Sequence, residues 1–399
     1  MAAACGLLDA NGSAKPTIFA EMSALAAHTS AANLGQGFPD EDGPAWIREA
    51  AVEAIRAGVN QYPPGRGTAE LRQAIAAHQA RRYGIELDAA TEVLVTTGAT
   101  EALAAALLAL TSPGDEVVTL EPFYDSHAAC IAMAGATHVT VPLEPRDGGF
   151  RLDTDALRRA VGPRTRLILV NTPHNPTGTV LTRQELSAIG AEAQRVDAIV
   201  VTDEVYEHLV FDEAEHVPIA SLPGMRERTL TISSSGKTFS LTGWKIGWVT
   251  GPAALIDAML AVKQFLTFTS GAPFQGAIAE ALGERGDADV TDLRDTLAFR
   301  RDLLLAGLQG AGFATVRPDG TYFVCADASP FLSDEVADGA AFARWLPEAI
   351  GVACVPLSAF CREGSPTASA LANWVRFTFV KREDTLRTAI ERLAGLSRG

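Results

Sequence analysis

Two lysines stand in an unusual setting within the stretch SSSGKTFSLTGWKIGW, residues 233–248. Lysine side chains are mostly solvated, yet Lys237 follows three serines and a glycine, and Lys245 follows Gly-Trp. An amine that is enclosed near another cation loses its proton more easily and becomes a nucleophile toward aldehydes. The stretch therefore predicts an active-site amine at Lys237.

The composition indicates a globular enzyme that acts on small molecules. A chain of 399 residues exceeds the usual size of one hydrophobic core, so we expect one large and one smaller domain. The formal net charge of −15 disfavours binding to nucleic acid or to an anionic membrane. No apolar run reaches the roughly 18 residues that span a bilayer, and residues 1–16 lack the pattern of a secretory signal.

The cysteines favour a reducing compartment. Five of them, including Cys5, are scattered along the chain without metal-ligand spacing. We therefore expect a cytoplasmic protein with no metal site.

Short apolar runs alternate with helix-like segments through the first two thirds of the chain. The expected strands cover 92–97, 116–121, 137–142, 166–170, 198–201, 229–233 and 246–250. Such alternation is typical of an α/β protein whose mostly parallel sheet of seven strands has helices on both faces. In these sheets the ligand binds beyond the carboxyl ends of the strands.

The pattern changes near residue 285, where a long amphipathic helix over 291–309 begins the last third. Segments 320–327 and 374–381 then read as strands of a separate layer. We expect a large domain over 46–284 and a smaller α+β domain built from 1–45 and 285–399.

Polar residues follow several of the expected strands. Gly98-Ala99-Thr100 opens an alanine-rich helix, which suits either a phosphate on bare backbone N–H groups or ordinary helix capping. Asn175, in the rigid turn NTPHNPTG, is either a donor to an anionic oxygen or a plain turn residue. Asp203 ends an apolar strand, where a carboxylate is costly to bury without a partner, although a helix cap is the alternative.

These residues meet at one edge of the expected sheet, together with Ser234 and Lys237. Pyridoxal 5′-phosphate requires this combination: a lysine for its aldehyde, a carboxylate for its ring nitrogen, donors for its phenolate oxygen and a phosphate cradle. The sequence therefore predicts this cofactor.

The motifs now identify a family. They are NLGQGFPD (33–40), NQYPPG (60–65), GATEAL (98–103), EPFYD (121–125), NTPHNPTG (171–178), TDEVYEHLVF (202–211), SSSGKTFSLTGWKIGW (233–248) and VRFTFVK (375–381). Over nearly its whole length the chain resembles the fold-type I, pyridoxal-phosphate-dependent aminotransferases of classes I and II.

The resemblance implies roles for the cofactor site. Lys237 forms the Schiff base, and Asp203 pairs with the pyridine nitrogen. The other implied cofactor contacts are Tyr206 and Asn175 at the phenolate oxygen, Tyr124 on the ring face, and Gly98, Ala99, Thr100, Ser234 and Lys245 at the phosphate. Lys245 stands where many relatives carry arginine, and Tyr124 where phenylalanine or tryptophan is common.

The resemblance also implies a substrate site and a partner. Arg376 would bind the substrate α-carboxylate, a task that suits a planar guanidinium, and Gly37 would line the substrate pocket. Tyr62 would reach the phosphate of the neighbouring subunit, so we expect a homodimer with shared sites.

Within the class, the motifs are similar to the branch of kynurenine, methionine and N-succinyldiaminopimelate aminotransferases. The expected reaction moves an amino group from an amino acid to a 2-oxo acid, with N-succinyl-LL-2,6-diaminopimelate, in lysine biosynthesis, as the expected donor. Glutamine, methionine or kynurenine transamination with cysteine-S-conjugate β-lyase activity is the alternative, and a cofactor-binding transcriptional regulator a remote one. Arg66 is a candidate for the distal carboxylate of a succinylated donor.

Overall fold

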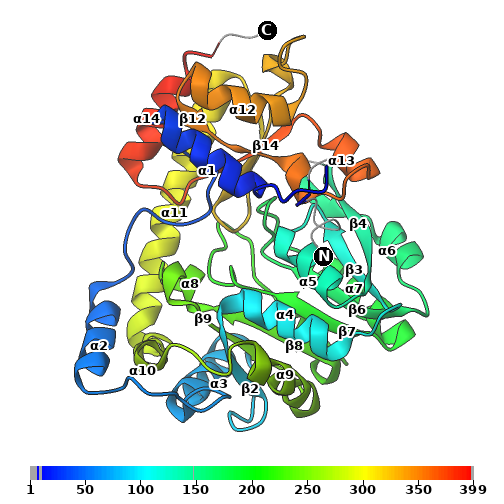
Figure 1. The fold of residues 1–399 in the computed structure, drawn as a ribbon, viewed down its shortest axis with the longest axis vertical. Coiled ribbons are helices and arrows are strands. Elements are labelled where there is room, and N and C mark those ends of the chain that lie inside the picture. Colours follow the sequence, from blue (N-terminus) through cyan, green and yellow to red (C-terminus); the bar gives the residue numbers. More distant parts are fainter. Residues whose placement is uncertain (1–6, 9–10, 147, 397–399) are drawn as a thin grey trace.

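The computed structural model describes residues 7–8, 11–146 and 148–396, and Cys5 lies outside this part. One large sheet and its helices form the lower part of Figure 1, and a smaller sheet lies above it. This confirms the predicted α/β fold. Within the described residues, no helix is long and apolar enough to cross a membrane.

The large sheet has the strand order β2-β9-β8-β7-β6-β3-β4-β5. Its strands are β2 Val93–Thr97, β3 Glu116–Glu121, β4 Thr137–Arg146, β5 Gly149–Leu152, β6 Thr165–Asn171, β7 Ile199–Asp203, β8 Thr229–Ser234 and β9 Ile246–Thr250. Strands β4, β3, β6, β7 and β8 run parallel, whereas β9 is antiparallel to both β8 and β2. All seven predicted strands are present.

Strand β5 is an eighth strand that the sequence did not suggest. It pairs antiparallel with the last residues of β4, Leu143 to Arg146. The expected strand stopped at Pro142, because proline usually marks the limit of a strand. Here β4 continues past that proline, and the four residues of β5 are too few to show a clear apolar alternation.

Helices cover both faces of the large sheet. The helices of this part are α4 Gly98–Leu110, α5 Asp125–Met133, α6 Thr154–Ala160, α7 Arg183–Val196 and α9 Ala253–Leu266. Helices α4, α5 and α9 share one apolar cluster with the sheet, and α6 and α7 share another on its other face. Further helices, α2 Ala45–Arg56, α3 Ala69–Tyr83 and α10 Ala272–Ala281, pack together around the β2–β9 end.

The second part combines the two ends of the chain. Its strands are β1 Ala32–Asn33, β10 Ala314–Val316, β11 Phe323–Asp327, β12 Val352–Ala353, β13 Val355–Pro356 and β14 Trp374–Thr378. Its helices are α1 Ile18–Thr29, α11 Glu284–Ala311, α12 Gly339–Ala349, α13 Pro366–Ala370 and α14 Glu383–Leu393. Strand β1 pairs with β12, so α1 lies beside α12 (Figure 1).

The long helix α11 contributes to two apolar clusters. Val290 belongs to the cluster of α2, α3 and α10, whereas Leu297 and Leu304 belong to the core beneath the smaller sheet. The predicted domain boundary falls at the first turn of this helix. The division into 46–284 and 1–45 with 285–399 stays a prediction.

Sheet register gathers the polar strand ends at one edge. Asn171, the last residue of β6, stands opposite Asp203, the last residue of β7. Ser234 ends β8, parallel to β7. Because β9 is antiparallel, its beginning rather than its end lies at this edge, which brings Lys245 there as well.

Candidate active site

A cavity of about 420 Å³ lies between this edge of the large sheet and the second part of the chain. Most of the predicted site residues line it: Gly37, Gly98, Ala99, Thr100, Tyr124, Asn175, Asp203, Tyr206, Ser234, Lys237, Lys245 and Arg376. Tyr62 is the one that does not. The fold thus brings together residues that are up to 339 positions apart in the sequence.

Lys237 lies in the short helix α8, Ser235–Thr238, directly after β8. Its Nζ donates to the Tyr322 hydroxyl at 2.8 Å and to the Gly37 carbonyl at 3.4 Å. The ammonium also lies 5.6 Å from the ring centre of Tyr206. The amine is therefore held at the inner wall of the cavity, between two aromatic rings, and not on the surface.

Asp203 is 4% exposed at the end of β7, where Asn171 secures the main chain. The Asn171 amide donates to the Asp203 carbonyl at 2.8 Å, and its Oδ1 accepts from the Asn175 N–H at 2.7 Å. One Asp203 carboxylate oxygen lies 3.5 Å from Nε2 of His127, which has no hydrogen-bond partner. A buried carboxylate with so few donors requires a cationic or N–H partner.

Two glycines shape the entry of helix α4 into the cavity. Gly98 has a φ of +71°, and a Cβ there would lie 3.2 Å from the Lys245 side chain. A Cβ on Gly247 would come within 2.6 Å of the Gly98 backbone, so β9 can pass against the helix start only without a side chain. The free N–H groups of α4 and the Lys245 ammonium form a cradle that suits a phosphate.

Arg376, on β14, is 2% exposed. It donates to Oδ1 of Asn175 at 2.8 Å and to the Gly35 carbonyl at 2.8 Å, and its Nε has no partner. Its guanidinium lies 3.9 Å from the ring centre of Phe323. Burial lowers the pKa of Arg376 to about 10, so it remains a cation that lacks a carboxylate partner.

Two tyrosines flank these groups. Burial raises the pKa of Tyr206 well above its ordinary value, and burial also raises that of Tyr124. Both phenols are therefore neutral and able to donate a hydrogen bond. Tyr206 packs edge to face against Tyr322, with ring centres 5.2 Å apart.

A buried polar network supports the turn that follows Asp203. Ser233 donates to Glu207 at 2.5 Å, and His216 contacts Glu204 at 2.8 Å. His78 and His208 share a hydrogen bond of 3.1 Å between their Nε2 atoms. Of the described residues, His78, Glu207 and His208 form a group with the composition of a metal site, and burial lowers the pKa of both imidazoles.

The chain matches a known protein family over most of its length. The family described as aminotransferase class I and II matches residues 29–393. The chain belongs to this family. It is 57% identical to a probable N-succinyldiaminopimelate aminotransferase of Mycobacterium tuberculosis, over 96% of both chains. It is 40% identical to methionine aminotransferase of Escherichia coli, over 78% of this chain and 80% of that one.

Solved structures agree with this assignment to the aminotransferases. The structure of N-succinyldiaminopimelate aminotransferase from Mycobacterium tuberculosis superposes with a TM-score of 0.92 at 56% identity, covering 96% of this chain and 97% of that one. The structure of an Escherichia coli methionine aminotransferase gives a TM-score of 0.90 at 39% identity, covering 96% and 97%.

Two residues singled out in the sequence lie outside the cavity of this aminotransferase. Tyr62 is 82% exposed and packs against Phe268, with ring centres 5.4 Å apart. Arg66 pairs with Asp257 of helix α9. Its guanidinium is thus already engaged, and this chain does not direct it to a donor bound in its own cavity.

Sequence reasoning missed three residues of the aminotransferase site. Asn171 is predictable, because it is a polar residue at the end of a buried apolar strand. Tyr322 follows a threonine with a φ of +66°, and the sequence suggested only a strand there. His127 gave no signal, since nothing local distinguishes it from an ordinary helix residue.

Proposed function

We propose that this aminotransferase uses pyridoxal 5′-phosphate to move the amino group of N-succinyl-LL-2,6-diaminopimelate to a 2-oxo acid, with 2-oxoglutarate as the expected acceptor. The observation that carries the proposal is that Lys237, Asp203 and Arg376 face one cavity. The identity of 57% to the mycobacterial relative supports the choice of donor and a role in lysine biosynthesis.

The residues present fit the cofactor. Asp203 is a buried carboxylate that lacks a strong donor, and a pyridinium N–H would supply one. The cradle of Gly98 and Lys245, which a Cβ at position 98 would crowd, suits the phosphate. We assign the cofactor contacts to Lys237, Asp203, Asn175, Tyr206, Tyr124, Gly98, Ala99, Thr100, Ser234 and Lys245. When bound, the cofactor withdraws electrons from the substrate α-carbon.

The protein supplies substrate binding and proton transfer. Arg376 binds the α-carboxylate, which restores a partner to its buried charge. Because Oδ1 of Asn175 accepts from Arg376, the Nδ2 end of this amide remains to donate to an anionic oxygen. Nζ of Lys237 takes the proton from the substrate Cα and would deliver it to the cofactor carbon that binds the amino group, while the Tyr322 hydroxyl orients the amine. Water supplies the oxygen with which the donor leaves as a 2-oxo acid, and the amino group stays with the cofactor. The acceptor then takes up that amino group through the same steps in reverse, with release of water.

We further propose a cytoplasmic homodimer with shared sites, acting on small molecules and not on nucleic acid or membranes. Exposed aromatic residues support the dimer: Tyr62 packs against Phe268, and Phe265, three residues before Phe268 in the chain, is 85% exposed. An apolar surface of this kind favours a protein partner. Tyr62 would then act in the neighbouring subunit.

A donor screen tests the proposal. Protein loaded with pyridoxal phosphate is assayed against 2-oxoglutarate with N-succinyl-LL-diaminopimelate, glutamine, methionine, kynurenine and aromatic amino acids. We expect the succinylated donor to give the highest kcat/KM. A preference for methionine or kynurenine would favour the alternative, and pyruvate release from a cysteine conjugate without any acceptor would indicate β-lyase activity. Protein that stays colourless with the cofactor would overturn the proposal.

A further inference from the structure

The segment Leu34–Glu41 forms one side of the cavity mouth. It begins where β1 ends, and Gly37 and Phe38 line the cavity. Residues at β14 hold its main chain: the Thr378 N–H donates to the Leu34 carbonyl at 2.8 Å, and Arg376 donates to the Gly35 carbonyl. Tyr322 donates to the Gly37 carbonyl at 2.6 Å. The segment is thus held in place by individual hydrogen bonds instead of a sheet.

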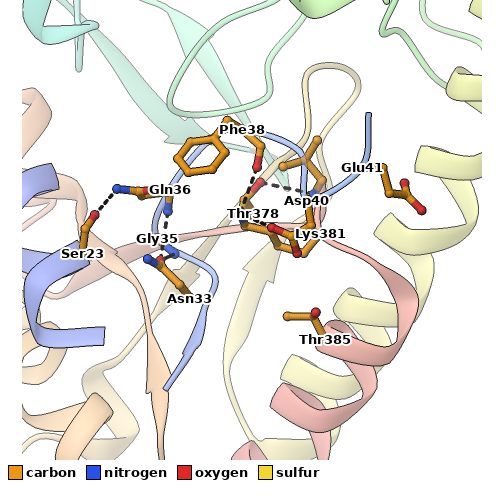
Figure 2. Close-up of polar contacts among 12 residues, drawn as sticks. Ser23, Asn33, Gly35, Gln36, Phe38, Asp40, Glu41, Thr378, Lys381 and Thr385 are labelled. Carbon is orange, nitrogen blue, oxygen red and sulfur yellow. Dashed lines mark hydrogen bonds and ion pairs between the residues drawn. The ribbon is translucent and has the colours of Figure 1, made fainter. Parts of the chain in front are cut away.

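Lys381 makes the last of these contacts. Its Nζ donates to the Phe38 carbonyl at 2.9 Å and to Oδ1 of Asp40 at 2.8 Å, and it lies 4.4 Å from the centre of the Phe38 ring. Figure 2 shows the ammonium between these groups, with Glu41 apart from them. The lysine is 4% exposed.

The arrangement restricts Phe38 in particular. The Lys381 ammonium binds the main chain at residue 38 and the side chain at residue 40, and Tyr322 holds the carbonyl of Gly37, so the backbone around Phe38 is fixed on both sides. Phe38 is 46% exposed and lines the cavity. Removing the ammonium would leave a partly buried carboxylate and a carbonyl without their donor, which favours movement of the segment.

The residue type fits this task. Only five of the 33 basic residues are lysines. A compact ammonium can donate to a carbonyl and a carboxylate that lie in different directions, whereas a planar guanidinium favours paired acceptors in one plane.

We propose that Lys381 is a positioning residue for the amino donor. By fixing Phe38 at the cavity mouth, it sets the apparent affinity for the donor while it contacts neither the donor nor the groups assigned to the cofactor. This inference rests on the proposed transamination for its kinetic consequence, but the clamp on the segment is a property of the chain alone.

The test compares Lys381→Met and Asp40→Ala with the control Glu41→Ala. Glu41 is the adjacent acid of the same segment, but it pairs with Arg300 of helix α11 at 2.9 and 3.0 Å. Amide hydrogen exchange of residues 34–41 is measured without cofactor or turnover. We expect exchange around Phe38 on the order of tenfold faster in the first two variants, and a much smaller change there in the control, which frees only the end of the segment.

Kinetics with the best donor complete the test. We expect KM for that donor to rise on the order of tenfold in Lys381→Met and Asp40→Ala. We also expect kcat within about threefold of the parent and unchanged visible absorbance of the bound cofactor. Should Lys381→Met fail to fold, Asp40→Ala alone decides the matter, because its side chain is partly exposed.

Three results would overturn the inference. These are unchanged exchange in Asp40→Ala, an equal effect of Glu41→Ala, or a fall in kcat with KM unaltered. If the parent protein itself fails to transaminate, the proposed function is wrong, and the exchange experiment still decides whether Lys381 holds the segment.

Discussion

The two walls of the cavity are built in different ways. The cofactor wall consists of Gly98–Thr100, Asp203, Ser234–Lys237 and Lys245, which all adjoin strands of one sheet. The donor wall combines Arg376 of β14 and Tyr322, which directly precedes the neighbouring strand β11, with Gly37 and Phe38. The last two come from the other end of the chain and are attached through single hydrogen bonds. Sheet register fixes the whole first wall, whereas in the second a few polar side chains attach the segment of Gly37 and Phe38 to another sheet.

This difference separates two kinds of defect. A change in the cofactor wall should alter retention of the cofactor and its visible absorbance. A change in the donor wall should leave the absorbance in place and alter donor affinity. The following predictions test that separation, from the largest expected effect to the smallest.

Lys237→Ala should abolish the visible absorbance of the cofactor in its Schiff base with the protein. It should also lower turnover by roughly a thousandfold or more, because the variant lacks both the amine that binds the cofactor aldehyde and the base that takes the Cα proton. Absorbance spectra and single-turnover assays measure the two effects. The exposed Lys15→Ala serves as control. Turnover close to that of the parent would refute the assignment of Lys237.

Arg376→Lys should lower kcat/KM for the donor about a hundredfold, since an ammonium cannot replace the bonds to Asn175 and Gly35 and also bind a carboxylate in two places. The absorbance of the bound cofactor should persist, as expected for the donor wall. Simultaneous loss of that absorbance would show that the two walls are not separable.

Acid should weaken the support behind the cofactor wall. Burial lowers the pKa of His78 from 6.5 to about 4, so below pH 6.5 the unfolded chain binds a proton that the folded chain does not. Above pH 6.5 this group therefore does not reduce the free energy of unfolding. As the pH decreases toward 4, the free energy of unfolding falls by on the order of 2–3 kcal/mol because of this group. Urea midpoints across this range measure the loss.

In the same experiment, His78→Gln should flatten the decline, while His28→Gln, at an exposed position, should leave it unchanged. A decline as steep in His78→Gln as in the parent would assign the acid sensitivity to other groups.

Arg66→Ala should have the smallest effect. Its pairing with Asp257 is largely at the surface, where such ion pairs contribute at most about 1 kcal/mol. We expect KM for succinylated and for neutral donors to change equally and by less than about twofold. A rise in KM for the succinylated donor alone would indicate that Arg66 binds the distal carboxylate of a donor in the neighbouring subunit.

The contrast between the walls also explains what the sequence could predict. Asp203 and Lys237 were recognisable because each directly follows an apolar strand, and parallel strands end at the same edge. Lys245 reached that edge for a reason hidden in the sequence, the antiparallel direction of β9. Resemblance to the family, not local pattern, supplied Arg376 and Gly37.

The remainder depended on tertiary contacts that leave no local signature. Tyr322 matters because its hydroxyl meets Lys237 and Gly37, which are 85 and 285 positions away. In the sequence, Lys381 reads as the polar end of a strand, because its contacts with Phe38 and Asp40 come from the opposite end of the chain. Strand β5 was not predicted because its four residues are too few for their apolar alternation to stand out in the sequence.

Strands β1 and β12 pair although they lie near opposite ends of the chain, which matters during synthesis. Ala32 finds its sheet neighbour, Val352, only after more than three hundred further residues have been made. The strands β2 to β9 can meanwhile pair among themselves, since all of them precede residue 251. On the ribosome the half of the pocket that faces the donor therefore closes last, and a prematurely terminated chain would carry an open, unfinished site.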